Sequence, residues 1–153
     1  CLSGEGAELQ ELDAMPRRLD ALTGCGRSDD PGLAVGSEVL TYAELETRVG
    51  ELASWLLGLG MVPGERVATW LPKTATACVM PLAAARAGMV HVPINPALKR
   101  GQVGYILADS GARVLVTQAA RAGTLVEGDV PDGCDIWEEE KGALRQAQPR
   151  RLR

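Results

Sequence analysis

The stretch RVATWLPKTATACVMPLAAARAGMVHVPI, residues 66–94, decides the fold of this chain. It predicts a strand at 66–71, a helix at about 74–87 that Gly88 closes, and a second strand at 89–94. Both strand-like runs are mostly apolar without strict alternation, which is typical of strands that are covered on both faces. Because the links between these elements are short, we expect a right-handed βαβ crossover and a parallel sheet.

The same alternation continues toward the C-terminus. A helix predicted at about 101–110, which Gly111 closes, precedes a strand at 113–117. Residues 118–126 are consistent with one more helix, and CDIW at 134–137 with a short strand. The predicted fold class is therefore α/β, with parallel-sheet βαβ layers.

Upstream of this region lies the clearest helix signal of the chain. Thr41 and Glu44 have the spacing of a capping box, in which each side chain accepts a hydrogen bond from the other residue's backbone N–H. Gly58 and Gly60 are expected to end this helix. Its apolar stripe, at helical spacing, consists of Leu45, Val49, Leu52, Ala53, Leu56 and Leu57.

Before that helix, LAV at 33–35 and VL at 39–40 predict a hairpin that turns across GSE. We divide the chain into three parts. Residues 1–32 form a helix (7–22, interrupted at Pro16) and a loop, residues 33–137 form the α/β segment, and residues 138–153 form a charged, frayed tail.

Composition excludes several classes of protein. The 153 residues, 46% of them hydrophobic, suffice for one core, and a net charge of −4 argues against nucleic acid as a partner. The longest apolar run is too short to span a membrane, and the acidic N-terminus does not have the pattern of a signal peptide. The four cysteines, at 1, 25, 78 and 134, have no C-x-x-C spacing. We therefore expect free thiols and a cytoplasmic chain.

His91 and Asn95 lie in HVPINPALKR, which the pattern places at the carboxyl end of a strand, where parallel sheets bind ligands. His91 has no acid or nucleophile placed by sequence to form a triad, so we interpret it as a packed or edge-facing strand residue. Asn95 stands between two prolines and is interpreted as a turn former whose amide bonds nearby backbone. The main role of residues 91–100 is therefore predicted to be a turn of the backbone.

Three other motifs favour structural over chemical roles. Lys73 and Thr74 open the helix after 66–71 and could hold a phosphate, but helix capping by Thr74 explains them. GLGMVPG at 58–64 follows a helix and has Pro63 where a dinucleotide loop needs glycine. Residues with metal-ligand spacing and paired carboxylates are absent from the sequence.

Blocks between Leu40 and Thr117 resemble a known family. LTYAELETRVGELASWLLGLGMVPGERVATWLP and LAAARAGMVHVPINPALKRGQVGYILADSGARVLVT are similar to the N-terminal part of AMP-forming acyl-CoA synthetases and related adenylate-forming enzymes. Within the family, NPALKRGQVGYIL is similar to bacterial acyl-CoA ligases associated with exosortase systems. The helix after the N-P loop departs from the usual Thr-Pro-Glu-Glu start, because KRGQ (99–102) lacks that cap and includes Gly101.

The resemblance implies a ligase that uses ATP, Mg²⁺ and CoA, with fatty acids among the substrates of its family. The family's Ser/Thr/Gly-rich phosphate loop, ribose-binding Asp and C-terminal Lys have no counterpart here, and Lys141 lacks that lysine's context. We therefore assign no catalytic, cofactor-binding or metal-binding residue to this chain, and no substrate-binding residue can be named.

We expect an N-terminal fragment of an acyl-CoA ligase, cut before the ATP-binding loop, incomplete as a domain and inactive alone. Such a fragment would leave apolar surface uncovered, which favours self-association or pairing with the rest of a synthetase. The alternatives are a non-catalytic module that pairs with a partner chain, and a non-functional remnant. A small Rossmann-like nucleotide-binding domain is disfavoured, because no glycine loop follows a strand.

Overall fold

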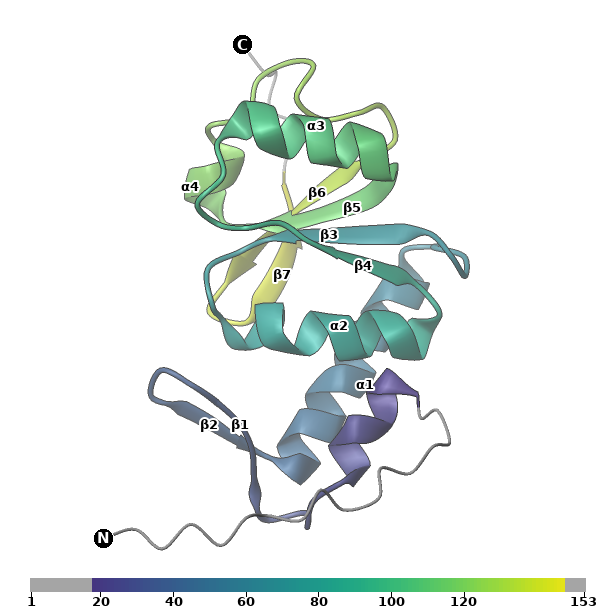
Figure 1. Ribbon diagram of the computed structural model, residues 1–153, viewed down its shortest axis with the longest axis vertical. Helices are drawn as coiled ribbons and strands as arrows, with labels where there is room; N and C mark the ends of the chain where they lie inside the picture. The colour runs from purple at the N-terminus through teal and green to yellow at the C-terminus, as the bar shows by residue number, and fades with distance from the viewer. Residues whose placement is uncertain (1–17, 148–153) are drawn as a thin grey trace, which may run out of the picture.

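A computed structural model describes residues 18–147, which form a five-stranded sheet flanked by helices (Figure 1). The strand order is β4-β3-β5-β6-β7. The strands are β3 (Arg66–Trp70), β4 (Val90–Pro93), β5 (Ala112–Thr117), β6 (Asp135–Glu140) and β7 (Ala143–Gln146). The first four strands in this order are parallel to one another, and β7 is antiparallel to β6. The predicted α/β class with a parallel sheet is confirmed.

Two helices make the crossovers that the sequence predicts. Helix α2 (Ala75–Ala87) joins β3 to β4, and α3 (Arg100–Ser110) joins β4 to β5. At the edge of the sheet, β4 bonds to β3 through Val90 N–H to Glu65 O at 2.9 Å and Ile94 N–H to Thr69 O at 2.8 Å. The predicted helix at 118–126 is only one turn, α4 (Ala119–Ala122).

Helices cover both faces of the sheet and enclose two cores (Figure 1). Helices α1 (Tyr42–Gly58) and α2 pack on one face, where Val49, Leu56 and Met80 are fully buried. Helix α3 packs on the other face, where Val103 and Leu107 are fully buried against β3 and β5. Coverage of both faces explains why β3 and β5 are apolar without alternation. The same prediction is wrong for β4, an edge strand in which Val90 is 48% exposed.

The helix ends confirm the local signals. Thr41 Oγ1 accepts from Glu44 N–H at 3.2 Å, and the Glu44 carboxylate accepts from Thr41 N–H at 2.8 Å, which completes the capping box. Gly88 and Gly111 follow α2 and α3 with φ of 76° and 62°, in the left-handed region that glycine tolerates. At the start of α3, where the usual cap is missing, the Gln102 side chain accepts from Lys99 N–H at 3.1 Å.

The N-terminal part differs from its prediction. The hairpin of β1 (Pro31–Val35) and β2 (Glu38–Thr41) is confirmed, with Gly36 at φ +60° in its turn. The predicted helix at 7–22 lies mostly outside the described residues, and its last part belongs to a 3₁₀ helix, η1 (Leu19–Gly24). Helix η1 packs on α1 and α2, so residues 19–24 are an integral part of the α/β unit.

A polar cluster fixes η1 to both helices. The Arg86 guanidinium on α2 donates to both carboxylate oxygens of Glu46 on α1 at 2.8 Å and to Asp20 Oδ2 on η1 at 3.4 Å. Thr23 donates to the same Glu46 carboxylate, and Arg18 donates to both oxygens of Asp20 at 3.0 Å. Hydrogen bonds from Arg86 and then from Thr23 lower the pKa of Glu46, and those from Arg18 and then Arg86 lower the pKa of Asp20.

The prediction of a frayed tail from residue 138 is wrong over 138–146, where β6 continues and β7 folds back on it. Lys141 (φ 50°) and Gly142 (φ 81°) form the two-residue turn, and two positive φ angles are the requirement of a type I′ hairpin. Trp137 of β6 packs edge-to-face on Trp55 of α1, with ring centroids 5.1 Å apart and planes at 83°. This aromatic contact and the turn make the charged segment a strand pair. Residues 148–153 lie outside the described part.

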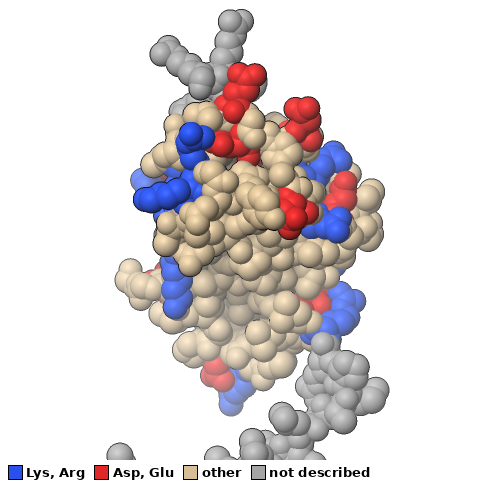
Figure 2. All heavy atoms as spheres, turned by 45° about the horizontal axis from the view of Figure 1, so that its top comes forward, with Lys and Arg blue, Asp and Glu red and all other residues tan. Residues whose placement is uncertain are grey.

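On the face shown in Figure 2, basic and acidic side chains are interspersed around a largely uncharged centre. Within residues 18–147, no helix is both long and apolar enough to cross a membrane. In the same range, Cys25, Cys78 and Cys134 form no disulfide. Burial, followed by the charge of Asp135, raises the pKa of the Cys134 thiol to about 11, which keeps it protonated at neutral pH.

Candidate functional site

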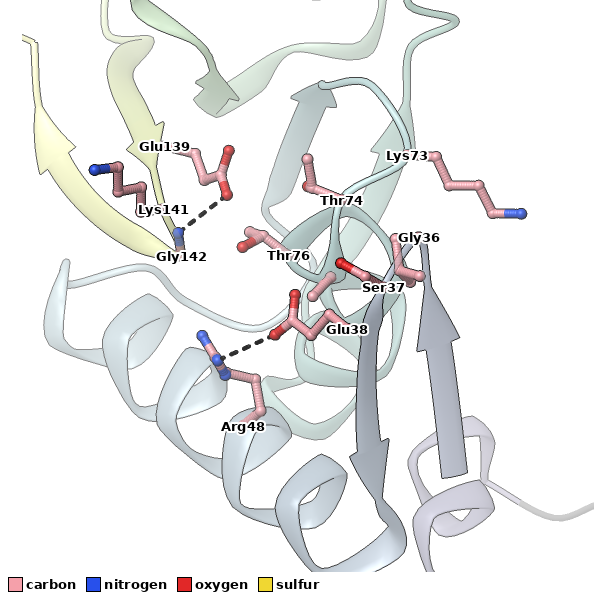
Figure 3. Close-up of a pocket in the computed structure, with 12 residues that line it drawn as sticks. Gly36, Ser37, Glu38, Arg48, Lys73, Thr74, Thr76, Glu139, Lys141 and Gly142 are labelled. Atoms are coloured by element: carbon pink, nitrogen blue, oxygen red, sulfur yellow. Dashed lines mark hydrogen bonds and ion pairs between the residues drawn. The ribbon is translucent and has the colours of Figure 1, made fainter. Parts of the chain in front are cut away.

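Three segments that are distant in sequence meet at a pocket of about 450 Å³, which we call the charged pocket. They are the β1–β2 turn, the start of α2 and the β6–β7 turn, with Arg48 of α1 at the base (Figure 3). The charged side chains that line it are Glu38, Arg48, Lys73, Glu139 and Lys141. Three basic and two acidic residues therefore border the pocket, and the ammonium ends of Lys73 and Lys141 point away from it in Figure 3.

Two contacts hold the acidic residues of this pocket. Arg48 lies 3.9 Å from a Glu38 carboxylate oxygen, which is a long ion pair. Glu139, only 9% exposed, accepts with Oε1 from Gly142 N–H at 3.3 Å. Arg48 also packs against the β6–β7 turn. A Cβ added at Gly142 would lie only 3.1 Å from Arg48 Nη1. The glycine at 142 thus lets the turn approach the arginine.

The start of α2 forms another wall of the charged pocket. Thr74 is the N-cap and accepts from Ala77 N–H at 3.2 Å, so the predicted capping role is confirmed. Lys73 stands at the rim and is exposed. Thr76 lines the pocket although only 3% of its surface is exposed. Helix N-termini carry partial positive charge, so this wall favours anionic groups.

His91 and Asn95 line a second hollow of about 430 Å³, the edge pocket, at the carboxyl ends of β3 and β4. His91 Nε2 lies 2.8 Å from Thr69 Oγ1 on the neighbouring strand, and burial lowers the pKa of the imidazole. Asn95 Oδ1 accepts from Ala97 N–H at 2.9 Å, which confirms its predicted bond to nearby backbone. Cys78 lines the same hollow. The edge pocket thus contains a half-buried, hydrogen-bonded histidine and a turn.

The sequence alone indicates Lys73 and Thr74 as candidates but not the other charged residues of the pocket. Glu38 and Arg48 occur in a predicted turn and on a predicted helix surface, where charge is ordinary. Glu139 and Lys141 fall in the segment predicted to be a tail. One signal was present: Lys141-Gly142 between two short alternating runs is a two-residue hairpin pattern. The family resemblance gave no hint of this pocket.

The described residues do not fit the nucleotide and metal that the resemblance implies. No group of three or more His, Cys, Asp or Glu side chains within residues 18–147 is arranged to hold a metal ion. The charged pocket would set Glu38 and Glu139 against any triphosphate, and like charges in a partly buried site repel. We therefore derive no step through ATP or Mg²⁺ at this chain.

Comparison with known proteins identifies the relatives of the chain. Residues 25–150 match the family model of AMP-binding enzymes. The chain is 41% identical over 90 residues to a linear gramicidin synthase polypeptide of Brevibacillus parabrevis, a match that covers 59% of this chain and 2% of that protein. It is 33% identical over 102 residues to long-chain-fatty-acid–CoA ligase FadD13 of Mycobacterium tuberculosis, covering 64% of this chain and 20% of the ligase.

The structure agrees with the sequence matches. A benzoate CoA ligase from Burkholderia xenovorans superposes with a TM-score of 0.71 at 28% identity, over 79% of this chain and 25% of that one. The chain thus spans a quarter or less of the length of these three relatives. A family match over most of the chain and a shared fold lead to one conclusion. The chain belongs to the family of AMP-binding, adenylate-forming enzymes.

Proposed function

We propose that the chain supplies the N-terminal α/β layer of an AMP-forming acyl-CoA ligase. The observation that carries this proposal is the family match over residues 25–150, which coincides with the parallel sheet and its two helix layers. The chain contributes scaffold to the enzyme, and further polypeptide supplies the phosphate loop. A CoA ligase is favoured over a peptide synthetase because the benzoate CoA ligase superposes over 79% of the chain with a TM-score of 0.71, whereas the nonribosomal peptide synthetase FmoA3 superposes over 71% with a TM-score of 0.62.

In the whole enzyme, a carboxylate oxygen displaces pyrophosphate from the α-phosphorus of ATP to give an acyl adenylate. The CoA thiol then displaces AMP to give the thioester. ATP, Mg²⁺ and CoA are the cofactors of this proposal, and fatty or aryl acids are its substrate class. The names of the relatives support that class, since they include a fatty-acid ligase and a benzoate ligase. Membership of the exosortase-associated subgroup and a cytoplasmic location stay predictions.

The test is ATP–pyrophosphate exchange. With the 153-residue chain alone, we expect no exchange above background for decanoate, benzoate or acetate. With a polypeptide that carries the chain together with a downstream phosphate loop, we expect exchange. Exchange by the chain alone would overturn the proposal, and restoration by a separate partner chain would favour the pairing module instead.

Helix α3 offers a matched pair of variants for the longer polypeptide. Leu107 is fully buried, and Tyr105 on the same helix is 71% exposed. If the layer acts as scaffold, Leu107→Asp should abolish the exchange and Tyr105→Asp should preserve it, because only the first change buries a charge. Equal activity of the two variants would contradict the scaffold role.

A further inference from the structure

Strand β7 is an open edge of the sheet, because β6 is its only neighbouring strand in the described part of the chain. Ala147 N–H donates to a β6 carbonyl at 2.9 Å. Backbone groups alternate sides along an antiparallel strand and the β6–β7 register has no shift, so Ala143 and Arg145 also bond to β6. Leu144 and Gln146 therefore direct both their N–H and their C=O groups away from the sheet.

This edge has what a further strand needs for pairing. Leu144 and Gln146 each present one donor and one acceptor on the outer side of β7. The Leu144 side chain packs partly against the core of the α1 face and is not fully buried. Added strands bind to such edges through main-chain hydrogen bonds, and apolar side chains beside the edge strengthen the contact.

The α1 face beside this edge lacks hydrogen-bond partners. Trp137 lies opposite Gln146 in the register and contacts Trp55. Both indole N–H groups are buried and have no hydrogen-bond partner in the described part of the chain. In an edge-to-face pair only one ring directs its edge at the other, so the contact leaves at least one N–H unsatisfied. Buried polar groups are almost always hydrogen-bonded, which indicates that this face is incomplete without further polypeptide.

The charge of Arg145 decides between two occupants of the edge. Arg145 is exposed and lies opposite Glu138 of β6, on the face away from Leu144. A second copy of the chain could use all the outward groups of Leu144 and Gln146 only by pairing about a two-fold axis at Arg145. The two arginines would then lie directly opposite each other, and like charges in that position destabilise a sheet. A different strand with an acidic residue at this position would instead be stabilised.

We propose that the polypeptide that completes the ligase adds a strand to β7, with an acidic residue opposite Arg145 and an apolar residue opposite Leu144. The acidic residue pairs with the guanidinium, and the apolar residue extends the core of the α1 face. The length of the relatives supports this occupant. The family match runs to residue 150, past the end of β7, and the benzoate CoA ligase is matched over 25% of its length. This inference rests on the proposed function, because it assigns a place to the polypeptide that carries the phosphate loop.

The test is amide hydrogen exchange, resolved to single residues by mass spectrometry with electron-transfer fragmentation. In the 153-residue chain alone, Leu144 and Gln146 should exchange at close to the rate of an unfolded peptide. In the polypeptide that also carries the downstream phosphate loop, both should exchange roughly 100-fold more slowly. Ala143 and Arg145 are the internal controls, because their N–H groups bond to β6 and should be protected in both polypeptides.

The results that would overturn the inference are distinct. Equal exchange of Leu144 and Gln146 in the two polypeptides would mean that no strand is added. Protection that grows with the concentration of the 153-residue chain would identify a second copy as the occupant. ATP–pyrophosphate exchange of the same sample separates this inference from the proposed function. An active polypeptide with unprotected amides refutes the added strand alone, whereas an inactive one with protected amides refutes the ligase activity alone.

Variants of the longer polypeptide test the pairing and the charge. Gln146→Pro removes an outward donor and should lower the protection of Leu144 roughly tenfold, whereas the matched Gln146→Thr keeps the donor and should change it by less than about twofold. Since proline is tolerated where an edge N–H faces solvent, both variants of the 153-residue chain should keep its Tm within about 2 °C. Arg145→Glu should lower the protection roughly tenfold and Arg145→Lys should preserve it. Unchanged protection in Gln146→Pro or in Arg145→Glu would refute the proposed strand.

Discussion

The contact between Trp55 and Trp137 tests whether residues 135–146 are a structural part of the domain. The two indoles belong to α1 and β6, and their edge-to-face geometry joins the hairpin of β6 and β7 to the helical layer. We predict that Trp137→Ala destabilises the chain by about 2–4 kcal/mol, since Trp-to-Ala changes in cores cost about 3–5 kcal/mol and this side chain is partly exposed.

The aromatic contact itself should appear as a coupling energy. Edge-to-face pairs contribute about 0.5–1.5 kcal/mol beyond the area that they bury. The cycle of Trp55→Leu, Trp137→Leu and the double variant should return that value, because leucine keeps the sites apolar. At roughly 2–4 °C per kcal/mol for a chain of this size, the Trp137→Ala loss corresponds to a Tm lowered by roughly 5–15 °C.

Urea unfolding followed by far-ultraviolet circular dichroism is the suitable assay, because tryptophan fluorescence changes with these substitutions. Tyr105→Ala is the matched control, since that ring is 71% exposed, and should change the unfolding free energy by less than about 0.5 kcal/mol. If Trp137→Ala behaves like Tyr105→Ala and the cycle gives no coupling, residues 135–146 do not pack on α1. The assignment of this segment as a strand pair would then be refuted.

Two further predictions concern backbone freedom and pH. Gly101→Ala should stabilise the chain by about 0.5–1 kcal/mol, because the added Cβ would enter open space on α3. Gly142→Ala should destabilise it by about 1–2 kcal/mol, because φ is 81° and Arg48 lies close to the added Cβ. If calorimetry shows that both variants shift the Tm in the same direction, this reasoning is refuted. The folded pKa of Glu46 is below its unfolded value, so its stabilisation is present above the unfolded pKa and is lost as pH falls through the folded pKa. Arg86→Met should therefore show a smaller loss of Tm between about pH 6 and about pH 3 than the parent chain, and parallel pH profiles would show that the pair is not the cause.

Most of the fold could be predicted because its signals are local. Thr41 with Glu44, Thr74, Gly88 and Gly111 mark helix ends through bonds to residues a few positions away, and apolar runs between them predict strands. Such signals need no knowledge of the tertiary structure. The order of strand, helix and strand then restricts the topology to a parallel sheet.

The hairpin at 135–146 and the charged pocket could not be predicted in this way. A run of three glutamates, Glu138 to Glu140, is typical of a solvent-exposed segment. The packing of Trp137 on Trp55, a residue distant in sequence, is what makes this segment part of the sheet. The pocket depends on three segments whose proximity arises from the sheet order, and no spacing in the sequence links Glu38 to Glu139. Residues that act through long-range contacts carry no local pattern.

The edge strand β4 has few backbone donors with which a further strand could pair. Val90 and Ile94 direct their N–H groups to β3, so the alternation of a strand turns His91 and Pro93 outward. Proline has no N–H, which leaves His91 as the single outward amide donor along the four residues of β4. A strand added from another chain would find the carbonyls of His91 and Pro93 but only one donor, which disfavours edge-to-edge pairing there. The proline thus makes β4 a poorer edge for an added strand than a strand of the same length with a donor at each outward position.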